Sequence, residues 1–185
     1  MKVEKDVIVF DIETQNTFAD VGNGGCAKLL LSVAVAYFYK DNSYRVYTEE
    51  NIGEFLPLLK AAELVIGFNI KGFDYPVLEK YFKEPLDEVR TLDILYKVHA
   101  SLGRRIKLDY LAEATLGSKK SADGLMAVKF WRSGRIDELI DYCRQDVKLT
   151  KELYEFGCQN SYLLYRKYGH LEKIPVSWCK KENFL

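Results

Sequence analysis

Apolar and polar positions along this chain follow either the two-residue period of a strand or the period of about 3.6 residues of a helix. The N-terminal part is rich in predicted strands, and strands and helices alternate after it. Short apolar or β-favouring runs predict five strands, at residues 7–12, 29–39, 44–48, 64–68 and 89–92. Helical spacing predicts helices at residues 51–62, with Asn51 as its cap, and at residues 74–82, 94–101, 108–116 and 136–156, with Gly103, Gly117 and Gly157 as stops. An antiparallel front half followed by β–α–β units is typical of an α/β fold, in which helices cover a mixed sheet.

The length of 185 residues and the 48% hydrophobic content fit a single domain with one substantial core. We expect this domain to occupy residues 1–172, and residues 173–185 to form an extended C-terminal tail. Charged residues follow Met1 directly, and no apolar run approaches the ~18 residues of a membrane span. We therefore expect a soluble, cytoplasmic protein without membrane contact. The four cysteines are widely spaced and form no C-x-x-C pair, which predicts reduced thiols.

The charges balance, with 27 basic and 27 acidic residues, so the chain lacks the overall basic excess of many nucleic-acid binders. Their distribution is uneven, however. Basic residues gather in the second half, at Lys97, Arg104, Arg105, Lys107, Lys119, Lys120, Lys129, Arg132, Arg135 and Arg144. Such residues either follow the phosphates of a nucleic acid around an acidic centre or form solvated helix faces, and the sequence leaves both readings open.

Two carboxylates end the first predicted strand. Asp11 and Glu13 are two residues apart, so their side chains point to the same side of the strand. Two carboxylates beside an apolar run repel one another and lose hydration unless cations offset the cost, and Mg²⁺ or Mn²⁺ prefers such oxygen ligands. The alternative is a solvated strand end.

Asp74 and Asp93 stand at predicted helix starts, where an aspartate is a favoured N-cap. Asp74, two residues before Pro76, is therefore either a metal ligand or a cap, and Asp93 is a reserve ligand or a cap. Tyr142 and Asp146 are four residues apart in a predicted helix, which places them on one face. A tyrosine there can orient a water while the aspartate holds an ion, or the tyrosine packs and the aspartate is solvated.

Three segments, FDIET, GFNIKGFDYPVL and YCRQD, together resemble the motifs of the DEDD superfamily of 3′-to-5′ exonucleases, in its tyrosine-containing branch (DEDDy). The second is similar to the proofreading exonuclease domain of family B DNA polymerases, and KLDYLAEATLG with LIDYCRQDVKLTKELY is typical of stand-alone exonucleases related to that domain. The resemblance spans about residues 7–156. Asp141, rather than His99 or His170, holds the position that the histidine-containing branch fills with histidine.

The resemblance implies a ribonuclease H-like α/β fold, with a central mixed five-stranded sheet flanked by helices. It implies a metal-dependent 3′-to-5′ exonuclease that binds two Mg²⁺ or Mn²⁺ ions and releases nucleoside 5′-monophosphates. The catalytic residues would be four metal-binding carboxylates and a tyrosine that positions water, namely Asp11, Glu13, Asp74, Asp146 and Tyr142. Residues near the terminal nucleotide would be Thr14, Gln15, Asn69 and Phe73.

The expected substrate is nucleic acid with a free 3′ end, with single-stranded DNA favoured over RNA, and a polymerase or helicase on another chain is a candidate partner. The alternatives are an RNA 3′-to-5′ exonuclease of the same branch and a non-catalytic nucleic-acid-binding module.

Overall fold

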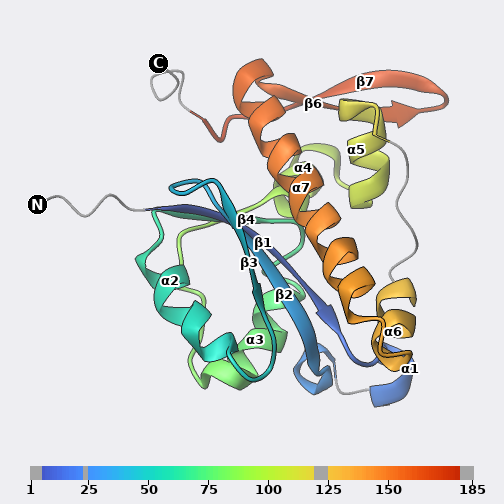
Figure 1. Cartoon of the computed structure of the whole chain (residues 1–185). Coiled ribbons are helices and arrows are strands. Elements are labelled where there is room, and N and C mark those ends of the chain that lie inside the picture. Colours follow the sequence, from blue (N-terminus) through green and yellow to red (C-terminus); the bar gives the residue numbers. More distant parts are fainter. Residues whose placement is uncertain (1–5, 23–24, 119–124, 180–185) are drawn as a thin grey trace, which may run out of the picture.

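A central sheet of five strands has the order β3–β2–β1–β4–β5 in a computed structural model that describes residues 6–22, 25–118 and 125–179 (Figure 1). The strands are β1 (Val7–Thr14), β2 (Leu31–Phe38), β3 (Ser43–Tyr47), β4 (Leu64–Gly67) and β5 (Thr91–Asp93). β1 pairs antiparallel with β2 and β2 with β3, whereas β4 runs parallel to both β1 and β5. The prediction of a mixed five-stranded sheet is confirmed. Lys119, Lys120 and residues 180–185 of the expected tail lie outside the described ranges.

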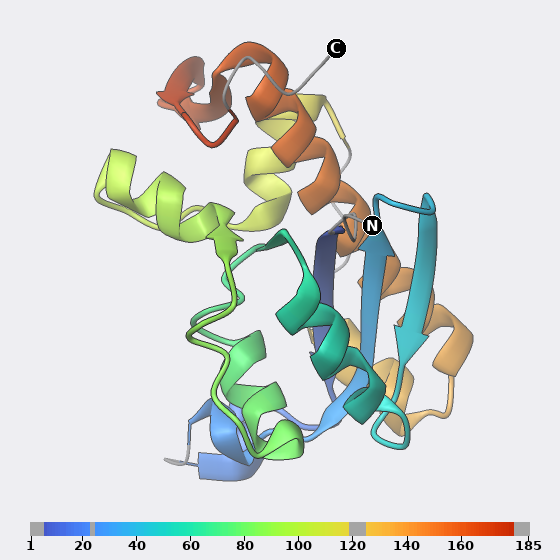
Figure 2. The same cartoon turned by 90° about the vertical axis from the view of Figure 1, so that its left-hand side faces the viewer.

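Helices cover both faces of the sheet, which explains why all eight residues of β2 are buried. One face carries α2 (Phe55–Ala61) and α3 (Asp74–Phe82), which lie in front of the sheet in Figure 2. The other face carries residues of α4 (Ile94–Leu102), α5 (Leu108–Leu116) and α7 (Ile136–Asn160). Along β1 the side chains of Ile8, Phe10 and Ile12 belong to the first core, while Val9 belongs to the second. The odd-numbered positions of β1 therefore face α7.

The helix predicted at residues 51–62 begins instead as a 3₁₀ turn, η3 (Ile52–Glu54), and continues as α2. Asn51 does not cap it, because its side chain accepts a hydrogen bond from the backbone N–H of Thr48, at 2.7 Å. A further 3₁₀ turn, η2 (Cys26–Lys28), precedes β2.

Among the α-helices and strands of the described ranges, four were not predicted: α1 (Phe18–Val21), α6 (Leu125–Arg132), and the hairpin of β6 (Tyr162–Lys167) with β7 (His170–Pro175). The hairpin lies beside α5 and forms a second, two-stranded sheet (Figure 1). Residues 173–175, expected to begin an extended tail, are paired with β6.

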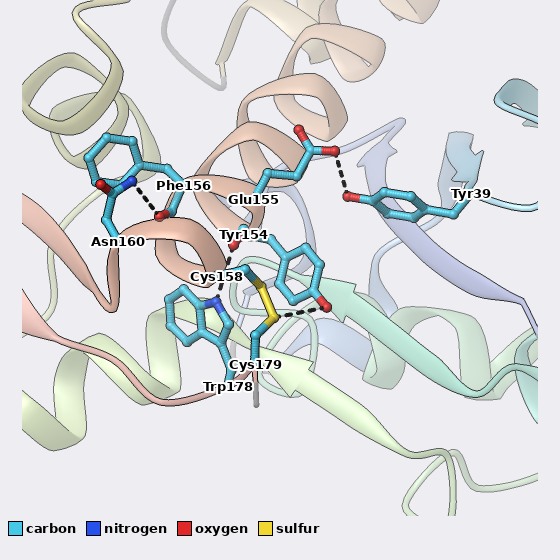
Figure 3. The surroundings of a disulfide bond; sticks show 8 residues. All are labelled: Tyr39, Tyr154, Glu155, Phe156, Cys158, Asn160, Trp178 and Cys179. Atoms are coloured by element: carbon cyan, nitrogen blue, oxygen red, sulfur yellow. Dashed lines mark hydrogen bonds between the residues drawn. A yellow bond between two sulfur atoms is a disulfide. The ribbon is translucent and has the colours of Figure 1, made fainter. Parts of the chain in front are cut away.

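The end of α7 differs from the prediction that Gly157 stops the helix. Gly157 lies inside it, and a side chain there would overlap the ring of Trp178, so the glycine provides room for the indole. Trp178 Nε1 donates a hydrogen bond to the carbonyl of Tyr154, at 3.2 Å. Next to this contact, Cys158 and Cys179 form a disulfide (Figure 3), so the expectation of reduced thiols is wrong for these two residues.

No helix within the described ranges combines the length and the apolarity needed to cross a bilayer.

Candidate metal centre

Three carboxylates from two distant segments gather where β1 ends. Asp11 and Glu13 project from β1 toward α7, and Asp146 projects from α7 toward β1. One ligand oxygen of each lies within 4.8 Å of the others, a spacing that a single divalent cation can bridge. The two-residue period of the strand brings the first two together, and the packing of α7 on β1 brings the third.

The helix α7 is held against β1 by a buried row of residues one turn apart, Leu139, Cys143 and Val147. The thiol of Cys143 donates to the backbone carbonyl of Asp11, at 3.3 Å, and lies 3.6 Å from its Oδ2 atom. This contact fixes the position of α7 along β1. It therefore positions Asp146, which lies just short of one turn further along the helix.

Asp74 reaches the same region from α3 and is only 2% exposed. It is the first residue of the helix rather than its N-cap, and its Oδ1 atom accepts a hydrogen bond from the backbone N–H of Ile12, at 3.1 Å. The pairing of β1 with β4 covers only Val7 to Val9, so the aspartate satisfies a donor beyond the end of that pairing. Asp74 thus adjoins the three-carboxylate cluster without belonging to it.

The acidic side chains raise one another's pKa. Burial is the main cause for Asp11 and Glu13, and the charges of Asp74 and Asp146 add to it. Burial raises the pKa of Asp74 to about 8, and burial with the charge of Asp109 raises that of Asp146 to about 7. Concentrated negative charge of this kind is offset naturally by a bound cation.

A cation also fits the hydrogen bonding of the site. The Oδ1 atom of Asp146 is buried and has no hydrogen-bond partner among the described residues. Buried polar atoms are nearly always paired, and a cation would supply the partner of this oxygen, because carboxylate oxygens suit Mg²⁺ or Mn²⁺. The donor set is consistent with either ion.

Tyr142 lies one turn before Asp146 and within electrostatic reach of the cluster. Burial raises the pKa of its phenol, followed by the charges of Asp146, Glu13 and Asp11. Its hydroxyl is therefore protonated at neutral pH. The ring packs at an angle against Phe130 of α6, with centroids 6.5 Å apart, so a residue outside the predicted motifs sets its orientation.

Thr14 and Gln15 follow the carboxylates directly, and both are already hydrogen-bonded. The Thr14 hydroxyl donates to the carbonyl of Asn16, at 2.9 Å. Gln15 Nε2 donates to the carbonyl of Leu31, at 2.7 Å, and to Glu49, at 2.9 Å. The amide of Gln15 therefore ties the end of β1 to the neighbouring strand.

Asn69 and Phe73 lie on the segment between β4 and α3. Asn69 has a left-handed backbone, with φ of 68°, and its Oδ1 atom accepts a hydrogen bond from Arg105, at 2.6 Å. Phe73 is partly buried and packs edge-on against Phe18 of α1, with ring centroids 6.1 Å apart.

Asp93 caps α4, as one of its two readings predicted. It accepts hydrogen bonds from the backbone N–H groups of Tyr96, Asn69 and Lys71, at 2.9 to 3.1 Å. These bonds tie the turn before α3 to the start of α4, so Asp93 shapes the segment that carries Asn69.

Two residues of the site were missed by the sequence reasoning, Cys143 and Asp109. Asp109 lies in the first turn of α5 and is close enough to raise the pKa of both Asp146 and Tyr142. Its segment, KLDYLAEATLG, is typical of the stand-alone exonucleases that the motifs resemble, and the acidic residue in this segment could have indicated a residue near the carboxylates. No signal marked Cys143, because a cysteine on an apolar helix face is ordinary core material.

Residues 8–157 match the sequence profile described as RNase_H superfamily. Among curated proteins, none reaches the level of a match. The structure is similar to that of the family B DNA polymerase from the hyperthermophilic archaeon Pyrobaculum calidifontis, with a TM-score of 0.63 and 21% sequence identity. The similarity covers 83% of this chain and 24% of the polymerase, so the chain spans about a quarter of that protein's length.

Proposed function

The chain belongs to the RNase H superfamily, whose match covers residues 8–157, and from this premise we propose that it is a metal-dependent nuclease that removes nucleotides from the 3′ end of a nucleic acid. The observation that carries the proposal is the cluster of Asp11, Glu13 and Asp146, with ligand oxygens within 4.8 Å of one another and one buried oxygen left without a partner. A bound cation accounts for this arrangement, because three ionised carboxylates with oxygens within 4.8 Å of one another repel and a cation offsets that repulsion.

Asp11, Glu13 and Asp146 would hold a first divalent ion, and Asp74, next to them, would complete the ligands of a pair. When bound, two Mg²⁺ or Mn²⁺ ions supply the positive charge that activates a water and stabilises the leaving 3′ oxygen of a phosphodiester. Asp74 also keeps the end of β1 in place through its bond to the Ile12 N–H group.

Tyr142 would orient the attacking water. Its raised pKa keeps the hydroxyl protonated, so it can exchange hydrogen bonds with a water but is a poor base at neutral pH. Burial of its ring and the contact with Phe130 limit the hydroxyl to a small range of positions beside the carboxylates. Such positioning is a recognised source of rate enhancement.

The 3′-to-5′ direction rests on the resemblance of the three motifs to the tyrosine branch of the DEDD exonucleases. One protein of similar structure is a DNA polymerase, and this similarity supports single-stranded DNA rather than RNA as the proposed substrate of this chain. A polymerase or helicase on a separate chain is the partner we propose, and repair of DNA is the corresponding role. Thr14, Gln15, Asn69 and Phe73 are the proposed contacts of the terminal nucleotide.

A time course on 5′-labelled single-stranded DNA and on matched RNA, with Mg²⁺, Mn²⁺ or EDTA, tests this function. The expected result is a metal-dependent ladder that shortens from the 3′ end and forms faster on DNA. Asp11→Ala should abolish the ladder, while Asp141→Ala, which removes an exposed carboxylate of α7 outside the cluster, should retain it. Faster cleavage of RNA would select the ribonuclease alternative. Binding without cleavage of either substrate would instead select the non-catalytic module.

A further inference from the structure

A groove separates the loop between α4 and α5 from the β6–β7 hairpin. Two adjoining hollows, of about 300 and 440 Å³, share Arg104, Tyr165 and Arg166 as lining residues. We call the two together the hairpin groove. The family match ends at residue 157, so the wall formed by the hairpin lies outside the part of the chain that the family describes.

The hairpin groove is strongly basic in a chain whose charges balance overall. Its lining includes five cationic side chains and, among the described residues, a single acidic one, Glu113. The five cations are Arg104, Arg105, Lys107, Arg166 and Lys167. Within the described ranges, Lys167 alone of these five forms an ion pair, with Glu172 at 3.8 Å.

Three arginines elsewhere in the second half behave differently. Arg132, Arg135 and Arg144 each pair with a carboxylate, namely Asp20, Glu138 and Asp141. Of the two readings that the sequence left open, these three arginines fit the solvated face. The groove cations fit the reading in which positive charge follows phosphates.

Exposed tyrosines accompany the cations. Tyr110 is 53% exposed, and Tyr168, at the tip of the hairpin, is 93% exposed. Tyr168 and Gly169 form a two-residue turn with φ of 49° and 86°, for which Asn-Gly is the favoured pair. A tyrosine with positive φ is strained, and a ring so exposed gains almost no packing in return. The fold therefore gives no reason for a tyrosine at this position, whereas a stacking ligand does.

The hairpin groove adjoins the metal centre through two connections. Arg105, from the groove, donates a hydrogen bond to Asn69, one of the proposed contacts of the terminal nucleotide. The first turn of α5 carries Asp109, which is close to Asp146, while Lys107 and Tyr110 on either side of Asp109 line the groove. A strand whose end lies at the carboxylates can therefore continue into the groove.

We propose that the hairpin groove binds the single-stranded part of the nucleic-acid substrate, several nucleotides away from the 3′ end that is cleaved. The inference rests on the proposed function for the position of that end. The groove cations contact phosphates, and bases stack on Tyr110 and Tyr168. Cations with exposed aromatic rings are the combination that binds unpaired strands without sequence preference, because only unpaired bases offer free faces.

Binding is measured by fluorescence anisotropy of labelled single strands of about three and about twelve nucleotides, the longer one within the range of known single-strand sites. EDTA prevents cleavage during the measurement. The wild-type chain should bind the longer strand more tightly than the shorter one. Replacing Lys107 and Arg166, one from each wall, by glutamine should weaken binding of the longer strand about tenfold at ~0.15 M salt. It should also lower the steepness with which the logarithm of the binding constant falls with the logarithm of the salt concentration, by about 1.4.

A control variant with Lys40→Gln and Lys60→Gln removes the same charge from the β2–β3 turn and from α2, away from the groove, and should bind like the wild type. Tyr168→Asn separates recognition from folding. Asparagine suits the turn, so the melting temperature should hold or rise, while affinity for the longer strand should fall roughly fivefold or more, the low end for one stacked base.

Unchanged affinity in both groove variants would overturn the proposal and leave the exonuclease intact. Failure of the wild-type chain to bind strands of either length would also overturn it, and would indicate an acidic protein segment as the occupant. Loss of binding in the groove variants of a chain that forms no ladder would support the groove and refute the proposed function, so the two can fail separately.

Discussion

Replacing Asp146 by asparagine should make the metal-free protein more stable and should remove its response to divalent ions. The substitution keeps the size of the side chain and removes one of the three carboxylates whose ligand oxygens lie within 4.8 Å of one another. Loss of activity alone would not test this reasoning, because many changes near a site reduce activity. A gain in stability is a sharper test.

The magnitude follows from the pKa of the group. Burial and the nearby Asp109 raise the pKa of Asp146 from an ordinary 3.8 to about 7. At about 1.4 kcal/mol for each tenfold change in the protonation equilibrium, the ionised form costs roughly 4 kcal/mol at pH 8. The amide also lacks a partner at this buried position, which costs about 1 kcal/mol. The net gain is about 2–3 kcal/mol, or roughly 5–10 °C in melting temperature for a domain of this size.

The sign of the pH dependence follows from the same shift. When the pKa of an acid is higher in the folded state than in the unfolded state, the protonated acid stabilises the fold. This stabilisation is fully present below the pKa of the unfolded state and is lost as pH rises to the pKa of the folded state. The advantage of Asp146→Asn should therefore be absent near pH 4, should grow as pH rises toward about 7, and should level off above that value.

Thermal denaturation in EDTA across this pH range, repeated with added Mg²⁺ or Mn²⁺, is the assay. Saturating metal should stabilise the wild type by about 2–3 kcal/mol at roughly 100 times its dissociation constant, and should leave the variant unchanged. Asp141→Asn serves as the control, because its carboxylate is exposed and, among the residues that the structure describes, forms an ion pair only with Arg144. If Asp146→Asn melts at or below the wild-type temperature in EDTA at pH 8, the electrostatic argument for a cation site is wrong.

Three further predictions concern packing and positioning. Tyr142→Phe should lower the cleavage rate about tenfold or more with an unchanged thermal shift on metal addition, and unchanged turnover would assign the tyrosine to packing. Gly157→Ala should destabilise the fold by about 1–3 kcal/mol, because its methyl group overlaps the ring of Trp178; denaturation in a Trp178→Ala background should show most of that penalty removed. Reduction of the Cys158–Cys179 disulfide, which closes a loop with a sequence separation of 21, should cost about 3 kcal/mol, and dithiothreitol should not affect the melting temperature of a double serine variant.

The parts of the fold that the sequence predicted are those in which local periodicity and tertiary packing agree. The segment of β1 is predicted as a strand and forms one, so the spacing of Asp11 and Glu13 correctly placed both side chains on one face. The structure shows that this face is the one toward α7. The helix α7 likewise places Asp146 where a four-residue period from Tyr142 predicts. In both cases the chemistry depends on a repeat contained within one element.

The remaining features depend on what lies opposite an element in space. From the sequence, Asp74 is a helix cap or a ligand, and only the structure shows that it bonds to Ile12, beyond the end of the β1–β4 pairing. Gly157 reads as a helix stop, because nothing local reveals that an indole from 21 residues further along needs the space. The hairpin that carries Tyr168 contains several charged residues on exposed strands, so its apolar pattern is too weak to predict two strands.

Although the net charge is balanced, acidic and basic side chains gather in different places, and this separation affects how such a site would work. Acidic residues converge on the end of β1, while five cations gather in the hairpin groove next to it, and within the described ranges only Lys167 among them forms an ion pair. An anionic strand is repelled by the carboxylates when they are bare and is attracted by the groove at all times. Metal binding should therefore strengthen binding of the 3′ end and leave binding along the groove unchanged. In that arrangement, salt weakens capture of the strand through the groove cations, whereas pH and metal control cleavage through the carboxylates, so the two dependences should respond to different substitutions.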